Sequence, residues 1–142
     1  MKKPNNILNF EISNKIELTE TSSPVFDIRE KEKQNIYKLD KNGNIIALNL
    51  CNNGFDKIQG LILFPDLEEL YLNGNQLEYL FIRDFFPNLK VLHISDNLLN
   101  DDSLDFYYLD NLEELYLNNN KLTGIPQSTH FPNLKVLSLA QN

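Results

Sequence analysis

The chain has few of the residues that build cross-links, metal sites or catalytic centres. Its 142 residues include one cysteine, two histidines and no tryptophan. One cysteine excludes an internal disulfide, and the sequence holds no His/Cys ligand cluster, no glycine-rich phosphate loop and no nucleophile beside a local base. We therefore expect no enzymatic activity, no cofactor and no bound metal.

A single cysteine and a cluster of three aspartates are the residues most similar to a reactive or metal-binding site. Cys51 is expected to be a small packed side chain rather than a nucleophile. The carboxylates of Asp101, Asp102 and Asp105 do not have the spacing of a calcium loop, and capping of a turn accounts for them.

Positive charge and long apolar runs are scarce as well. The formal net charge is -7, which argues against nucleic acid or an anionic membrane as partner, because affinity for either comes mainly from lysine and arginine. No run is long enough to span a membrane, and the apolar residues after position 6 are interrupted by polar ones, unlike a secretory signal. The length and composition predict one globular domain.

The sequence does contain a repeat. Residues 67–77 read L-x-x-L-x-L-x-x-N-x-L, and the same spacing starts at Ile45, Leu89, Leu112 and Leu134, in steps of 22, 22, 23 and 22 residues. The alternation Leu70-x-Leu72 is typical of a short strand with one buried face. One such strand buries little by itself, so the units are expected to stack with their strands parallel and their leucines in one continuous core.

This pattern resembles the leucine-rich repeat family over residues 45–142. The resemblance implies an α/β solenoid, a horseshoe or arc with a parallel β-sheet on its concave face and short loops with 3-10 or helical turns on its convex face. The units would be 45–66, 67–88, 89–111, 112–133 and a partial 134–142. It also implies a ladder of asparagines that satisfies backbone groups where the chain leaves each strand, at Asn53, Asn75, Asn97 and Asn120, with Asn142 at the matching position. Because extracellular members usually have cysteine-bridged caps, the single cysteine favours a cytoplasmic location.

Two apolar rows are predicted on the convex side. A stacked spine is expected at Phe64, Phe86, Leu109 and Phe131, and a second inward row at Ile58, Leu80 and Ile125. The third unit has Asp102 at the second row's position. Its residues 101–108 are expected to make a helical turn capped by an Asp or Ser, with Leu104 pointing inward.

Residues 1–35 are interpreted as an N-terminal extension, partly ordered or disordered. Apolar residues alternate with polar ones from Leu8 to Leu18, which is consistent with a small hairpin turning at Ser13-Asn14. The stretch from Val25 to Lys33 is either a short helix or an irregular charged tail.

Residues 36–44 are predicted to form an N-terminal β-hairpin cap. Asn42-Gly43 between alternating apolar residues indicates a type I′ turn, with Leu39 facing Ile46 and Tyr37 facing Leu48. At the other end the fifth unit stops at Asn142, halfway round a turn. Two interpretations stay open: the chain is a fragment of a longer protein, or its bare edge at residues 134–139 finds a partner, including a second copy of itself.

The concave face carries the candidate binding site, in two rows of side chains that point away from the core. The predicted protein-binding residues are Glu69, Tyr71, Val91, His93, Glu114 and Tyr116. Tyrosine gives a large contact area with few torsions to restrict. We therefore predict a non-enzymatic protein-protein interaction module that binds a protein or peptide. The alternatives are a sheet face that binds nothing, or a targeting or autoinhibitory arm of a larger regulator or enzyme, such as a GTPase, kinase, ligase or phosphatase-regulating subunit.

One feature weakens this assignment. The sequence Glu-Glu-Leu-Tyr-Leu-Asn occurs at residues 68–73 and again at 113–118, which an internal duplication explains. Part of the concave chemistry can therefore reflect copying of a two-repeat block.

Overall fold

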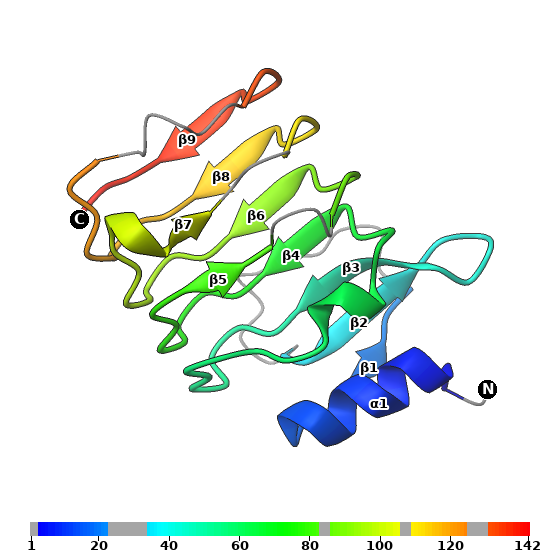
Figure 1. The fold of residues 1–142 in the computed structure, drawn as a ribbon. Helices are drawn as coiled ribbons and strands as arrows, with labels where there is room; N and C mark the ends of the chain where they lie inside the picture. Colours follow the sequence, from blue (N-terminus) through cyan, green and yellow to red (C-terminus); the bar gives the residue numbers. More distant parts are fainter. Residues whose placement is uncertain (1–2, 23–33, 83–85, 106–108, 125–130) are drawn as a thin grey trace.

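A computed structural model describes residues 3–22, 34–82, 86–105, 109–124 and 131–142. The chain winds as a solenoid around one leucine-filled core, with a seven-stranded sheet along one side (Figure 1). The sheet order is β1-β2-β3-β4-β6-β8-β9. Its strands are β1 (Thr19–Glu20), β2 (Ile36–Leu39), β3 (Ile45–Asn49), β4 (Glu69–Tyr71), β6 (Val91–His93), β8 (Glu114–Tyr116) and β9 (Val136–Ser138).

The repeat sets the register of the sheet. From β3 to β9 every pair of neighbours is parallel, and each strand aligns with the equivalent residues of the next unit. The central aligned position is a leucine in every one of these strands: Leu48, Leu70, Leu92, Leu115 and Leu137. The first four have no exposed surface, as expected if leucine burial drives stacking of the units.

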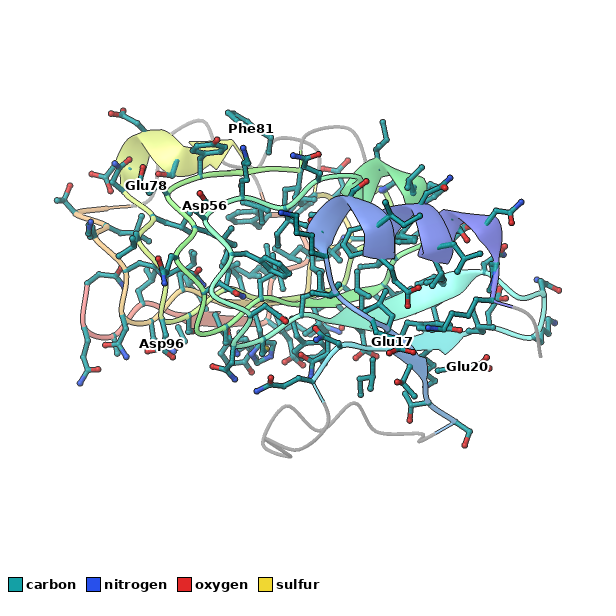
Figure 2. All side chains as sticks on the ribbon, turned by 90° about the horizontal axis from the view of Figure 1, so that it is seen from below. Glu17, Glu20, Asp56, Glu78, Phe81 and Asp96 are labelled. Carbon is teal, nitrogen blue, oxygen red and sulfur yellow. The ribbon has the colours of Figure 1, made fainter. Side chains whose placement is uncertain are left out.

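Among the described residues, the elements of the convex side are short. They are the 3-10 turns η1 (Leu61–Leu63) and η2 (Asp101–Ser103), and two strands, β5 (Leu80–Phe81) and β7 (Leu104–Asp105), which pair in parallel. The 3-10 turns were expected, but the second, two-stranded sheet was not. Figure 2 shows Glu78 and Phe81 on this side, opposite the seven-stranded sheet.

The predicted spine is confirmed. Phe64, Phe86 and Leu109 are buried, and Phe131 is partly buried against the same core. In the second row Leu80 is buried, Ile58 packs against the core and Asp102 is exposed. Ile125, the side chain of Leu104 and the segment 125–130 lie outside the described part of the chain.

An asparagine row runs inside the turn that follows each strand. Asn97 is representative: its Oδ1 accepts from the backbone N–H of Leu77 at 3.1 Å, and its Nδ2 donates to the carbonyl of Leu72 in the preceding coil at 3.0 Å and to Ile94 at 3.2 Å. Asn75, Asn120 and Asn142 bond their preceding coils in the same way. Each side chain therefore pairs backbone groups of two successive coils. Carbonyls such as that of Leu72 accept from two successive asparagines, whereas the N–H of Leu77 has the amide of Asn97 as its acceptor and would be costly to leave unpaired.

The first asparagine of the row has a different partner. Asn53 donates to the Oδ1 of Asn35 at 2.8 Å, just before β2, instead of to a preceding repeat. The side chain of Asn35 thus occupies the place that a backbone carbonyl takes in the later coils.

A left-handed residue occurs at the same position of every coil, just after the strand. Asn52, Gly74, Asp96, Asn119 and Gln141 all have φ between 51° and 69°. Asparagine, aspartate and glycine tolerate this conformation better than most residues. At Gly74 an added Cβ would also overlap Oδ1 of Asn52, so a larger residue there would displace the Asn52 side chain.

The prediction of a hairpin around Ser13-Asn14 is wrong. Residues Asn5–Asn14 form the helix α1, which covers the N-terminal end of the core (Figure 1). Burial follows helical spacing, because Ile7 and Phe10 are buried whereas Ile12 is 76% exposed. Phe10 packs on Phe64 of the spine, with ring centroids 5.0 Å apart. The proposed helix between Val25 and Lys33 lies outside the described residues.

The hairpin of β2 and β3 is partly as predicted. The strands are antiparallel and Tyr37 faces Leu48, but Leu39 faces Ile45 rather than Ile46 because a bulge follows Lys38. The turn is not type I′, since Gly43 has a positive φ and Asn42 does not. The carboxylate of Asp40 accepts from the backbone N–H groups of Asn42 and Asn44, each at 2.8 Å, and this favours the longer loop.

The cap of the turn at Asp101–Ser103 is also different from the prediction. Oδ1 of Asn100 accepts from the N–H of Asp102 at 3.0 Å, while Oγ of Ser103 accepts from the N–H of Asn100 at 3.0 Å. This is a reciprocal capping box with asparagine, not Asp or Ser, at the first position.

Candidate functional site

The concave face is the surface formed by the outward side chains of β3, β4, β6, β8 and β9. Each strand contributes two of them, because side chains alternate between the core and the outside. The first row is Ala47, Glu69, Val91, Glu114 and Val136; the second row is Asn49, Tyr71, His93, Tyr116 and Ser138. All six predicted binding residues fall on this face, side by side on three adjacent strands.

Three rings of the second row stack along the sheet. The centroids of Tyr71 and His93 are 4.9 Å apart with planes inclined by 28°, and those of His93 and Tyr116 are 3.9 Å apart at 17°. In-register parallel strands lie about 4.8 Å apart, so rings at equivalent positions meet face to face. The stack fixes the orientation of all three side chains.

Each tyrosine is also tied to a carboxylate of the first row. The hydroxyl of Tyr71 donates to Glu69 at 2.7 Å, and that of Tyr116 donates to Glu114 at 3.0 Å. Burial, and then the hydrogen bond to glutamate, raise the pKa of both phenols above their usual value. Both tyrosines therefore stay neutral, and the glutamates stay in place beside the rings.

The side chains at the two ends of the concave face differ in solvent exposure. At the first repeats Ala47, Cys51 and Tyr71 pack together, with exposures of 1%, 5% and 6%. Glu69, Val91, His93, Glu114 and Tyr116 are only half-buried, and Val136 is 37% exposed. The expectation that Tyr71 offers contact area is wrong, because its ring is buried and supports the stack; the accessible part of the face consists of Glu69 and the side chains from β6 to β9.

Burial also sets the protonation states of Cys51 and His93. It raises the pKa of the Cys51 thiol to about 11, in agreement with a packed, unreactive side chain. It lowers the pKa of His93 to about 4, so the imidazole is neutral near pH 7. His130 lies outside the described residues.

Salt bridges run along one border of the concave face. Lys90 pairs with Glu68, and Lys135 with Glu113, both at 2.7 Å. Within the part of the chain that the structure describes, no lysine or arginine pairs with Glu69 or Glu114. Since His93 is neutral, the accessible face carries uncompensated negative charge.

A second candidate surface lies on the convex side. A hollow of about 180 Å³ opens between the first two coils, and its rim is formed by Ile62, Tyr79 and Phe81. Ile62 and Phe81 are mostly exposed, and the rings of Tyr79 and Phe81 are 5.1 Å apart. This apolar surface had no signal in the repeat pattern, because it is formed by side chains of two coils that lie together only in the folded chain.

The described residues contain no group of three or more His, Cys, Asp or Glu side chains able to hold a metal ion. None of their helices has the length and apolar character of a membrane span. The carboxylate of Asp101 accepts hydrogen bonds from the backbone N–H groups of Thr123, at 2.8 Å, and Gly124, and from the hydroxyl of Thr123. Its role in the described structure is to link two coils.

Parallel strands in strict register, one per coil, together with the asparagine row, define a solenoid built from repeated β units. Family models agree with this class: "Leucine Rich Repeat" matches residues 66–87, and "Leucine Rich repeats (2 copies)" matches residues 110–142. The chain thus contains leucine-rich repeats, stacked in one parallel sheet. Such repeats are generally protein-interaction modules. A search of curated proteins found no match.

Proposed function

We propose that this chain is a non-enzymatic interaction module that binds a protein or peptide on its concave face. The observation that carries the proposal is the row of stacked rings, since His93 and Tyr116 are held rigidly and are still partly accessible. Pre-ordered aromatic side chains lose little entropy on binding. Val91, Glu69 and Glu114 complete the contact surface, and Tyr71 acts as its support. As part of the proposal we place the protein in the cytoplasm, in keeping with its single cysteine.

Affinity capture with the purified chain tests this proposal, with retained proteins quantified by mass spectrometry. Tyr116→Ala should reduce retention of a true partner, because loss of an aromatic anchor costs at least about 1 kcal/mol. Phe81→Ala removes an aromatic ring of the convex hollow and is the matched control, so it should leave retention unchanged. Loss of the same partner in Phe81→Ala but not in Tyr116→Ala would place binding on the convex side instead.

Self-association through β9 is a second candidate function. On this edge strand Val136 and Leu137 are 37% and 46% exposed, whereas the equivalent leucines of the earlier strands are buried. An exposed apolar edge strand is a template for pairing with another chain. Sedimentation velocity across a concentration series tests it: association that Leu137→Glu abolishes supports this function, and a monomer at every concentration excludes it.

A further inference from the structure

The row of stacked rings ends at β8. Tyr116 presents one ring face to His93, and because the two rings are nearly parallel, its opposite face looks along the sheet towards β9. The residue of β9 in that row is Ser138, whose hydroxyl donates to Oδ1 of Asn118 at 2.7 Å. A serine is too short to cover the ring. Among the described residues, no ring stacks on that face of Tyr116.

The spacing of the strands leaves room above Ser138 for one more flat group in the stack. Strands β8 and β9 are neighbours in the parallel sheet, so their rows lie about 4.8 Å apart. His93 and Tyr116 already stack across the equivalent pair of strands. A flat group above Ser138 would therefore lie against Tyr116 in the same way.

The charge around this place is negative. Glu114 stands beside Tyr116 on β8. Among the described residues, its carboxylate accepts one hydrogen bond, from the hydroxyl of Tyr116 to Oε2. A carboxylate accepts about four hydrogen bonds, so Glu114 has capacity for further donors. The nearest lysine along β9, Lys135, is paired with Glu113. Val136, partly exposed next to Glu114, offers an apolar surface for an alkyl chain.

We propose that the concave face recognises an arginine side chain of the partner polypeptide, with its guanidinium stacked on Tyr116 above Ser138 and hydrogen-bonded to Glu114. This inference rests on the proposed function and specifies the partner's chemistry. Guanidinium is planar, cationic and rich in N–H donors, so it satisfies the ring face and the carboxylate together. The ammonium of lysine carries the charge but is not flat, and citrulline is flat but carries no charge.

NMR titration of the labelled chain with three pentapeptides tests the inference. The peptides are acetyl-Gly-Gly-X-Gly-Gly-amide with X as arginine, lysine or citrulline. The arginine peptide should shift the ring signals of Tyr116 and the amide of Ser138, with an affinity about tenfold above that of the citrulline peptide, since its hydrogen bonds are charge-assisted. Equal affinities for arginine and citrulline, or shifts confined to other residues, would overturn the inference.

The internal duplication supplies a matched control. Glu114→Gln should weaken the arginine peptide about tenfold, whereas Glu69→Gln should change it less than about twofold, because Glu69 stands beside the buried Tyr71. Ser138→Tyr should abolish the shifts by placing a fourth ring in the stack, with the remaining spectrum showing that the fold is kept. Equal effects of Glu69→Gln and Glu114→Gln would indicate general attraction to negative charge and would contradict the proposed position.

Failure of this inference is distinguishable from failure of the proposed function. A partner protein that Tyr116→Ala releases but Glu114→Gln does not would overturn the arginine contact and leave concave-face binding intact. Arginine-selective shifts at Tyr116, combined with capture that Tyr116→Ala does not change, would support the subsite and contradict the proposed function.

Discussion

The side chain of Asn14, the last residue of α1, pairs with the backbone of Gln59 in the first repeat. Its Nδ2 donates to the Gln59 carbonyl at 2.9 Å, and its Oδ1 accepts from the Gln59 N–H at 3.0 Å. A single side-chain amide thus makes the two bonds that a neighbouring peptide group would make. The helix is fixed to the solenoid at this point as well as through Phe10.

Replacing Asn14 by alanine should therefore destabilise the chain. Three hydrogen bonds are lost at a half-buried site, the two to Gln59 and one to the carbonyl of Phe10, so we expect about 1 to 2 kcal/mol less free energy of unfolding, measured with urea. Asn9→Ala in the same helix is the control, because Asn9 is exposed. Alanine favours helix, so that change should be neutral or slightly stabilising. Similar losses in both variants would contradict the role of the Asn14 amide.

Asn97→Ala should destabilise the chain as well. It leaves the Leu77 N–H without its acceptor inside the core, whereas the Leu72 and Ile94 carbonyls keep the bonds from Asn75 and Asn120, so we expect a loss of about 1 to 3 kcal/mol. Asn88→Ala, at an exposed turn, should stay within about 0.5 kcal/mol. A loss in Asn97→Ala as small as in Asn88→Ala would show that the asparagine row contributes little.

His93 should make the stability depend on pH. Burial lowers its pKa to about 4 from 6.5, so between these values the unfolded chain binds a proton that the folded chain does not. The contribution of neutral His93 to the free energy of unfolding is fully present above about pH 6.5. It decreases by about 1 to 3 kcal/mol as the pH falls towards 4. His93→Phe keeps a ring in the stack and removes this titration. The difference in unfolding free energy between the two proteins, measured from pH 4 to 7, should change over that window; a constant difference would refute the assignment.

The carboxyl group of Asp101 should have a pKa below its usual value. The hydroxyl of Thr123 is the main cause of its lowered pKa, and the backbone N–H groups of Thr123 and Gly124 add to it. Because the folded pKa is depressed, the stability from this contact is present above the usual value of 3.8 and is lost as the pH falls through the folded pKa. Thr123→Val should raise the pKa of Asp101, and Thr123→Ser should leave it low, as followed by the carboxyl carbon signal in NMR. No difference between the two variants would mean that the hydroxyl does not hold the carboxylate.

The strand positions and the spine were predictable because their signals are local and repeated. Leu70-x-Leu72 and its equivalents each predict a strand with one buried face, and every repeat unit contains the same pattern. The tetrapeptide Phe64-Pro65-Asp66-Leu67 and its copies mark the convex turn in the same way. No long-range information was needed for these elements.

The N-terminal region was ambiguous for the same physical reason. Its apolar residues fit a strand at Leu8, Phe10 and Ile12, and a helix at Ile7 and Phe10. Only the core of the first repeat selects between them, since Phe10 reaches Phe64 from a helix and leaves Ile12 in solvent.

The sequence by itself determined the class of fold and the six side chains of the candidate site, because both follow from a period that every unit repeats. The tertiary structure decided which of those side chains are accessible: Tyr71 became a buried support, and Tyr116 a half-buried end of the stack. It also decided the neutral state of His93 and the open ring face beside Ser138. Burial, ring stacking and pKa depend on what lies across the strand, and residues 22 or 23 positions apart meet only once the coils have stacked.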